Sequence, residues 1–194
     1  MARFLVLQLR PEDEASDDEF AAFLRQGGLN ADETHRIRLD QDRLPAGLRL
    51  EDYAGVIVGG GPGCVSDDPA TKDPIEARIE ADCLSLMPDI VARDMPFMGC
   101  CYGIGILAHH LGADVSKARY GEPVGPVDCR LTDAGAHDPL LAGLDREFAA
   151  LVGHKEAVQH LPDGGHEREN FRSDVEEALC ELIGVNGIVT EADA

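Results

Sequence analysis

Long hydrophobic runs are missing from this sequence of 194 residues. The N-terminal stretch MARFLVLQLR has only a short apolar run before acidic residues begin, which is too short for a signal peptide. No other segment approaches the roughly 20 apolar residues that span a bilayer. We therefore expect no membrane association and a cytoplasmic location.

Positive charge is also scarce. The sequence has 17 Lys and Arg residues against 37 Asp and Glu residues, which gives a formal net charge of −20. Nucleic acids and anionic membranes attract proteins through basic surfaces, so this acidic composition argues against both as partners. An acidic surface favours solubility but does not identify a ligand.

Cysteine pairs of the Cys-x-x-Cys type are absent, and the cysteine density is far below that of small secreted scaffolds. Reduced thiols are therefore the expected state of the cysteines, at positions 64, 83, 100, 101, 129 and 180. The sequence also lacks internal repeats and low-complexity tracts. Neither a cofactor nor a metal site is indicated.

Apolar segments of strand length alternate with amphipathic helical patterns along the first part of the chain. Strands are expected at 3–9, 34–39, 54–58 and 96–100, and helices at 16–28, 74–94 and 102–112. Ser16 and Glu19 form a capping-box pattern that would begin the first helix, and Gly27 would end it. This alternation predicts an α/β fold with a flavodoxin-like parallel sheet and helices on both faces. After about Ser116, short runs interrupted by Pro and Gly predict added strands or a hairpin.

Two adjacent cysteines lie between glycines in PFMGCCYGIG, where an apolar run turns into a helical pattern. A nucleophile on a tight strand-to-helix elbow needs small residues two positions before and two positions after it. Gly99 and Gly103 meet this requirement for Cys101, whereas Cys100 has bulky residues at the same offsets. Because a helix N-terminus favours the thiolate, Cys101 is the candidate nucleophile after the fourth strand. A buried cysteine pair with incidental glycines is the alternative.

A second glycine cluster, GGGPG at residues 59–63, follows the third expected strand. Its spacing matches neither the dinucleotide motif nor a P-loop, so a phosphate site is not expected. If the third and fourth strands are neighbours, their carboxyl ends lie about 5 Å apart and this loop lies beside Cys101. Its backbone N–H groups, with the amide of Tyr102, would then form an oxyanion hole. A loop that only turns the chain is the alternative.

These two motifs, in this order, resemble those of the class I glutamine amidotransferases, the family of the amidotransferase domain of GMP synthase. The resemblance covers residues 1–163 and includes a third motif, the Gly-His loop VGHKEAVQHLPDG. It implies a Cys-His-Glu triad that attacks the side-chain amide of glutamine, forms a glutamyl thioester and releases ammonia. The implied partners are glutamine and an ammonia-accepting synthetase.

The resemblance also implies roles for individual residues by motif position. Cys101 would be the nucleophile. The oxyanion donors would be Gly60 or Gly61 together with Tyr102, and the glutamine pocket would include Gly63, Gly105, Gly153 and His154.

The sequence departs from the family pattern in two places. Many members carry a glutamine that helps to hold the substrate at the position occupied here by Gly105. The histidine and glutamate of the triad normally lie in a late His-Pro-Glu strand, a motif that occurs nowhere in the 194 residues. The His-x-Glu formed by His154 and Glu156 could act as a substitute base and orienter. The resemblance instead implies that His154 and Glu156 belong to the loop of the glutamine pocket.

Residues 164–194 show no likeness to the family. Their sequence predicts a charged turn, one capped helix near 173–182 and a short tail. We therefore expect an amidotransferase-like domain at 1–163 and a divergent C-terminal segment that reflects divergence, truncation or a frameshift. An uncompleted sheet leaves an edge with unpaired backbone groups, so association into a homo-oligomer is a further expectation.

Three functions remain open at this point, and the sequence does not decide whether the chain is a working enzyme. The first is a glutamine amidotransferase, or glutamine amidohydrolase, impaired by the absence of His-Pro-Glu. The second is a non-catalytic or truncated interaction module that keeps the fold. The third is a thiol hydrolase or redox sensor built on the same kind of elbow.

Overall fold

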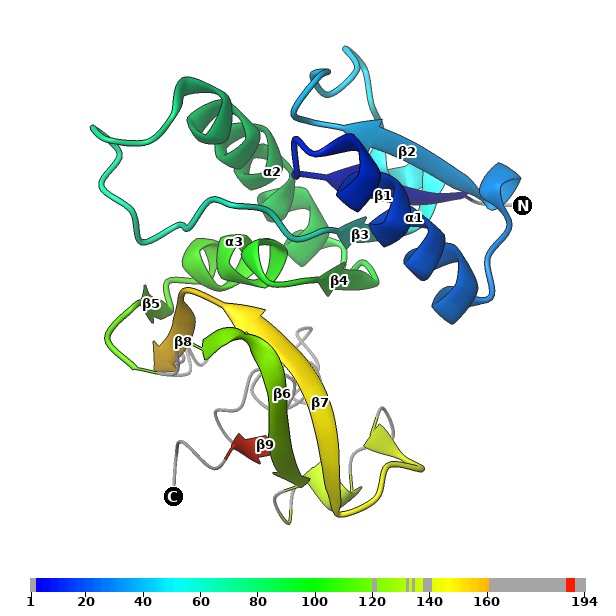
Figure 1. Ribbon diagram of the computed structural model, residues 1–194. Helices are drawn as coiled ribbons and strands as arrows, with labels where there is room; N and C mark the ends of the chain where they lie inside the picture. The colour runs from blue at the N-terminus through cyan, green and yellow to red at the C-terminus, as the bar shows by residue number, and fades with distance from the viewer. Residues whose placement is uncertain are drawn as a thin grey trace. The chain divides into compact units, whose positions relative to one another are not determined.

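The computed structural model describes residues 3–119, 122–131, 133, 135–137, 141–160 and 188–190. The chain divides into two compact units, Met1–His110 and Leu111–Ala194 (Figure 1). The first unit contains a parallel sheet and the elbow at Cys101. The second contains two small antiparallel sheets.

The first unit is built on a four-stranded parallel sheet in the order β2-β1-β3-β4 (Figure 1). Its strands are β1 (Arg3–Gln8), β2 (Thr34–Arg38), β3 (Tyr53–Val58) and β4 (Phe97–Gly99). The helices are α1 (Asp13–Gly27), α2 (Pro74–Ala92) and α3 (Tyr102–His110), with short 3-10 turns at Ala31–Glu33 and Leu50–Asp52. The step from β1 to β2 runs opposite to the step from β3 to β4, so right-handed crossovers put α1 and α2 on opposite faces. The predicted α/β fold with a flanked parallel sheet is confirmed.

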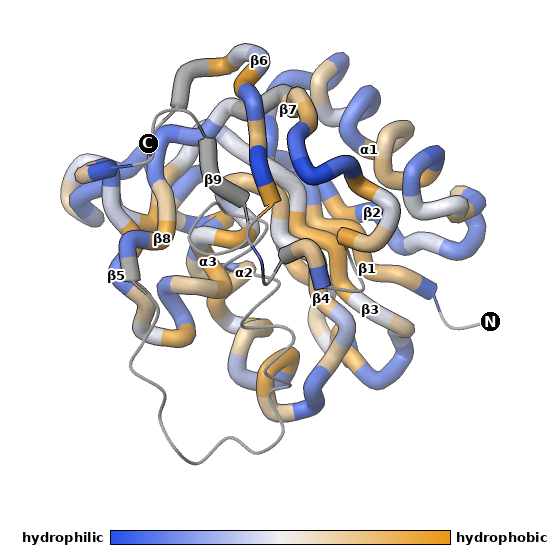
Figure 2. Tube along the Cα trace, turned by 90° about the horizontal axis from the view of Figure 1, so that it is seen from below, coloured by the Kyte–Doolittle hydropathy of each residue, from blue (hydrophilic) through white to orange (hydrophobic). Residues whose placement is uncertain are grey.

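The core of this unit lies along the two central strands. Leu5, Val6 and Leu7 of β1 and Val58 of β3 are completely buried, and Val56 of β3 is nearly so. Consecutive residues are buried because helices cover both faces of a parallel sheet, which explains the continuous apolar runs in the sequence. Figure 2 shows these strands as hydrophobic tubes inside the unit.

Strand register brings three chain segments to one edge of the sheet. Leu7 pairs with Val58, and Val58 pairs with Gly99. Because the strands are parallel, the segments that follow β1, β3 and β4 all leave from this edge. Ligand sites of open α/β sheets lie at this carboxyl edge.

Helix α1 begins earlier than the capping-box pattern predicted. It starts at Asp13, and Glu12 at the N-cap position makes no side-chain cap bond. Ser16 is completely buried inside the helix, and its Oγ accepts a hydrogen bond from Arg36 at 3.1 Å. The capping box was therefore wrong, because tertiary partners take up the side chain that would have capped the helix. The predicted end at Gly27 is confirmed.

The second unit contains the added strands that the change of pattern after Ser116 predicted, including an antiparallel pair of consecutive strands. One sheet pairs β5 (Asp114–Ser116) with β8 (Ala157–His160), and the other has the order β7-β6-β9, with β6 at Glu122–Leu131, β7 at Glu147–His154 and β9 at Ile188–Thr190. The buried Gln159 of β8 links its strand to the end of β5 and to the segment that follows. Its side-chain amide donates to the carbonyls of Ser116 at 3.1 Å and Arg119 at 3.0 Å.

The helix expected near 173–182 lies outside the described residues. Across the part of the chain that the structure does describe, no helix is both long and apolar enough to cross a membrane.

Candidate active site

The elbow predicted at Cys101 is present between β4 and α3. The N–H of Cys100 donates to the carbonyl of Val58 at 2.9 Å, which completes the strand pairing. The carbonyl of Cys101 accepts from the N–H groups of Ile104 at 3.1 Å and Gly105 at 3.2 Å, which starts the helix. Between these two patterns Cys101 has a φ of 51°, a left-handed conformation that costs a non-glycine residue on the order of 1–3 kcal/mol. Its side chain is exposed.

The two flanking glycines are required by close backbone packing. A Cβ on Gly99 would lie 2.7 Å from the carbonyl carbon of Gly103. A Cβ on Gly103 would lie 2.6 Å from the carbonyl oxygen of Val58. Backbone atoms of a strand and a helix cannot give way as a flexible side chain does. The Gly-x-Cys-x-Gly spacing is therefore a steric condition for placing α3 against the ends of β3 and β4.

The glycine loop that follows β3 lies against the elbow. A Cβ on Gly60 would lie 3.6 Å from the Cβ of Cys101. Gly61 and Gly63 are in contact with the ring of Tyr102, because their Cβ positions would lie 3.3 Å and 2.6 Å from its ring atoms. The structure thus brings together five of the residues singled out in the sequence.

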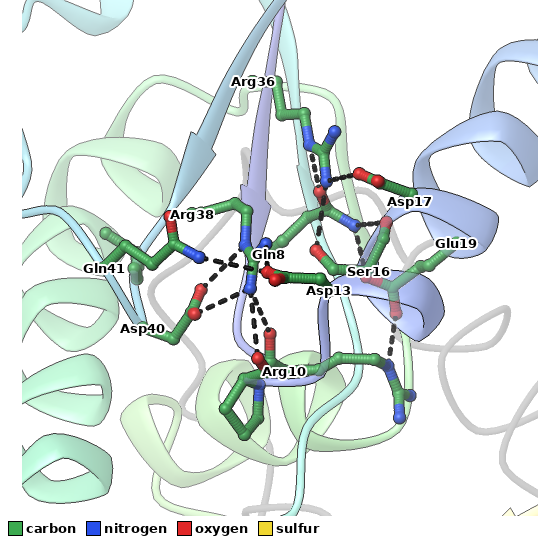
Figure 3. A network of polar contacts seen from close by, with 12 residues as sticks. Gln8, Arg10, Asp13, Ser16, Asp17, Glu19, Arg36, Arg38, Asp40 and Gln41 are labelled. Carbon is green, nitrogen blue, oxygen red and sulfur yellow. Dashed lines mark hydrogen bonds and ion pairs between the residues drawn. The ribbon is translucent and has the colours of Figure 1, made fainter.

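The amide of Gly60 has a partner that the sequence did not suggest. Its N–H donates to Oε1 of Glu19 on α1 at 3.0 Å. The same carboxylate accepts from Nε2 of Gln8 at 2.9 Å and lies 3.4 Å from Nε of Arg10 (Figure 3). The sequence pattern assigns Glu19 to a helix cap and gives no sign of its contact with the loop. Arg10 could have been found, because it follows β1 at the same carboxyl edge.

Tyr102, the residue after the candidate nucleophile, is held by a buried ion pair. Its hydroxyl donates to Oε2 of Glu80 on α2 at 2.7 Å. Lys72 donates to both oxygens of Glu80, at 2.7 Å and 2.6 Å, and its side chain is only 4% exposed. The ion pair therefore fixes the ring of Tyr102, and with it the beginning of α3. These partners lie far from Tyr102 in sequence and carry no motif.

The described cysteines differ in their electrostatic environments. Burial raises the pKa of Cys83 to about 12. Burial, with smaller contributions from the negative charge of Glu19 and from Cys101, raises the pKa of Cys100 to about 11. Both are therefore almost entirely protonated at neutral pH, whereas the exposed Cys101 lies at the N-terminus of a helix.

Gly105, at the position where the family carries a glutamine, is buried within α3 of the first unit. The other predicted site residues belong to the second unit. Gly153 lies in β7, where a Cβ would lie 2.8 Å from Cγ2 of Val124. His154 ends β7, paired in register with Glu122, and is half-buried. Glu156 lies between β7 and β8 and is also half-buried. Within the described residues, no cluster of three or more His, Cys, Asp or Glu side chains could hold a metal ion.

The arrangement of strand, glycine loop, elbow and helix agrees with a comparison against protein families. Residues 22–184 match the model of the family "Glutamine amidotransferase class-I". The chain belongs to this family. The match continues past residue 163, where the resemblance noted in the sequence ended.

The relatives of this class I amidotransferase domain include much longer proteins. It is 34% identical over 110 residues to the glutamine-hydrolysing GMP synthase of Symbiobacterium thermophilum, covering 57% of this chain and 18% of that protein. It is 31% identical over 139 residues to that of Lactobacillus gasseri, covering 68% of this chain and 24% of that protein. The chain thus spans less than a quarter of the length of these two relatives.

Solved structures support the fold of the class I amidotransferase domain. A glutamine amidotransferase from Methylobacillus flagellatus superposes with a TM-score of 0.59 at 22% identity, covering 84% of this chain and 59% of that one. A glutamine amidotransferase from Thermotoga maritima gives a TM-score of 0.60 at 20% identity, covering 84% and 64%.

Replacing Gly103 tests the steric condition at the elbow. We expect Gly103→Ala to lower the free energy of unfolding by about 1–3 kcal/mol, because its Cβ would meet a backbone carbonyl. Gly125→Ala is the matched control, since a Cβ there meets nothing within 4 Å. Equal denaturation midpoints for the two variants would contradict the steric argument.

Replacing Lys72 tests the anchor of Tyr102. Lys72→Met leaves the Glu80 carboxylate without its cation, and breaking a buried pair in this way costs about 3–5 kcal/mol. The double variant Lys72→Met, Glu80→Gln removes the stranded charge and should recover much of this loss. Urea denaturation measures both, and a double variant less stable than Lys72→Met would show that the ion pair does not act as a unit.

Brief treatment with iodoacetamide at pH 7 tests the ranking of the cysteines. With a pKa of about 11, Cys100 has only about 1 in 10⁴ of its molecules as thiolate at pH 7. We expect Cys101 to be modified at least 10-fold faster than Cys83 or Cys100, as measured by peptide mass spectrometry. Modification of Cys64 or Cys180 ahead of Cys101 would remove the argument for a reactive elbow.

Proposed function

We propose that this chain is the glutamine-binding domain of an amidotransferase, with Cys101 as its nucleophile. Three observations support this: family membership, the strained backbone of Cys101 and its exposure at the N-terminus of α3. The thiolate of Cys101 attacks the side-chain amide carbon of glutamine, forming a C–S bond. The C–N bond then breaks, the leaving nitrogen takes up a proton and ammonia departs, leaving a glutamyl thioester.

The oxyanion of this reaction would be held by the amides of Gly61 and Tyr102. Gly60 and Gly61 were equivalent candidates in the sequence. The hydrogen bond from the Gly60 amide to Glu19 favours Gly61, because an amide already bonded to a carboxylate is a poor donor to a second negative charge. Gly63, Gly105 and the loop at Gly153 and His154 would contribute to the glutamine pocket.

Completing the cycle requires a base. Hydrolysis of the thioester needs a water molecule to lose a proton, and the family performs this step with the His-Pro-Glu histidine. The 194 residues contain no such motif, and His154 with Glu156 is the substitute that the sequence offers. We therefore propose that the chain forms the thioester but turns over slowly.

A non-catalytic interaction module is the second candidate. The absence of His-Pro-Glu from these residues favours it, because the fold and elbow can be retained without turnover. In either case the named relatives are GMP synthases, so we propose a synthetase as the partner that accepts ammonia.

Glutamate release from glutamine separates these two functions. We expect a rate about 10³-fold or more below that of a family member with His-Pro-Glu, since a positioned imidazole contributes about 10²- to 10⁴-fold and triad members act as a unit. The assay compares the wild type with Cys101→Ala, His154→Ala and, as a control, His109→Ala at the end of α3.

The glutamate-release rates of these variants distinguish the slow enzyme from the interaction module. Low activity that only Cys101→Ala abolishes supports the slow enzyme. Equal background in all variants supports the interaction module. Robust activity lost in both Cys101→Ala and His154→Ala would contradict the expected impairment and make His154 the working base.

A further inference from the structure

Glu19 is a carboxylate placed inside the carboxyl edge of the sheet rather than on the surface of α1. Its side chain is only 14% exposed. One oxygen accepts from the Gly60 amide at 3.0 Å and lies 3.4 Å from Nε of Arg10, while the other accepts from Gln8 at 2.9 Å. Gln8 is itself completely buried and is fixed by Arg36 and the carbonyl of Ser16 (Figure 3).

This carboxylate shapes the loop beside the nucleophile. A Cβ on Gly59 would lie 2.4 Å from Oε2 of Glu19, so the side chain fills the space that the glycine leaves. The Cβ position of Gly60 lies 2.8 Å from Nη2 of Arg10 and 3.6 Å from the Cβ of Cys101. Glu19, Arg10 and Cys101 therefore surround a single residue of the glycine loop.

A run of three glycines needs an external anchor to hold one conformation. Glycine loses more conformational freedom on ordering than any other residue. Within residues 59–61, the Gly59 amide donates to the carbonyl of Leu7 at 2.8 Å and the Gly60 amide donates to Glu19. The bond to Glu19 thus anchors the residue directly before Gly61, to which we assign the oxyanion donor.

We propose that Glu19 is a positioning residue, which orients the glycine loop for acyl transfer at Cys101. The role rests on the proposed function. Glu19 fixes Gly60 and thereby directs the amide of Gly61 toward the reacting carbonyl, without touching the substrate. Its negative charge opposes formation of a thiolate nearby, and Arg10 offsets that charge. Loss of Glu19 should therefore weaken carbonyl activation while leaving the intrinsic reactivity of the thiol unchanged or higher.

Two electrophiles separate these effects. Iodoacetamide alkylates a thiolate by displacement of iodide and creates no oxyanion. Diazo-oxo-norleucine is a diazoketone analogue of glutamine whose ketone oxygen accepts hydrogen bonds from the oxyanion hole. Its diazo carbon takes up a proton, and the thiolate then bonds to that carbon as dinitrogen leaves. The ratio of the two rates at Cys101 reports loop positioning independently of thiol reactivity.

The experiment compares the wild type with Glu19→Ala, Glu19→Gln and Asp18→Ala, using the second-order rates of both reagents at pH 7. Asp18→Ala removes the same charge from an exposed neighbour on α1.

We expect Glu19→Ala to lower the rate at which Cys101 captures the diazoketone by about 10-fold or more, because a displaced oxyanion donor costs up to about 10²- to 10³-fold. Its iodoacetamide rate should not fall. Glu19→Gln keeps an oxygen acceptor for Gly60 and should stay within about 3-fold of the wild type, as should Asp18→Ala.

Each other outcome counts against a specific claim. An unchanged rate ratio in Glu19→Ala overturns the positioning role. So does faster diazoketone capture in that variant, which would make Glu19 an inhibitory occupant of the site. A parallel loss of both rates, or new labelling of the buried Cys83, would indicate general damage to the fold and also overturn it. A wild type that reacts with iodoacetamide at Cys101 but not with the diazoketone refutes the proposed function, and the role of Glu19 fails with it.

Discussion

The first unit depends on a contact between two pieces of backbone. The start of α3 lies so close to the end of β3 that no side chain fits between Gly103 and the carbonyl of Val58. This approach forces the chain through the left-handed conformation of Cys101 and aims its side chain outward. It also brings Tyr102 against the glycine loop. Strain at one residue is tolerated because strand pairing on one side and helix hydrogen bonds on the other determine its position.

Several of the scarce positive charges link elements that are distant in sequence. Arg36 of β2 reaches Gln8, Ser16 and Asp17, Arg43 binds both oxygens of the buried Asp82, and Lys72 binds both oxygens of Glu80. The sequence has more than twice as many Asp and Glu residues as Lys and Arg residues, so acidic partners outnumber the cations. Ion pairs with one exposed partner, such as Arg36–Asp17, contribute little to the free energy of unfolding. The Lys72–Glu80 pair is largely buried, so removing one partner alone is expected to destabilise the fold.

Family membership and activity rest on different parts of the chain. The elbow and the glycine loop belong to Met1–His110, and both lie within the residues that match the class I amidotransferase family. The base that the family needs comes from later in the sequence, where the motif is absent from these 194 residues. Thiol attack and thioester hydrolysis are therefore separable questions for this protein.

Local sequence was sufficient for the strands and for the elbow, which depend on neighbours along the chain. The apolar runs predicted the four strands, because a parallel sheet buries both faces, and glycine spacing predicted the elbow, because only small residues fit there. The order of the strands then placed the glycine loop beside Cys101. The later Pro- and Gly-interrupted runs correctly predicted added strands, but their lengths and pairing partners could not be assigned from pattern alone.

Tertiary structure alone decided which side chains meet at the site. Ser16 and Glu19 have the spacing of a helix cap, yet the helix starts at Asp13 and both side chains have distant partners. Glu80 and Lys72 likewise look like ordinary surface charges until α2 folds over Tyr102. A local pattern fixes backbone conformation over a few residues, whereas the partner of a long polar side chain is set by whichever elements the fold packs around it. For that reason the elbow at Cys101 could be predicted from the sequence, and the residues that hold its surroundings could not.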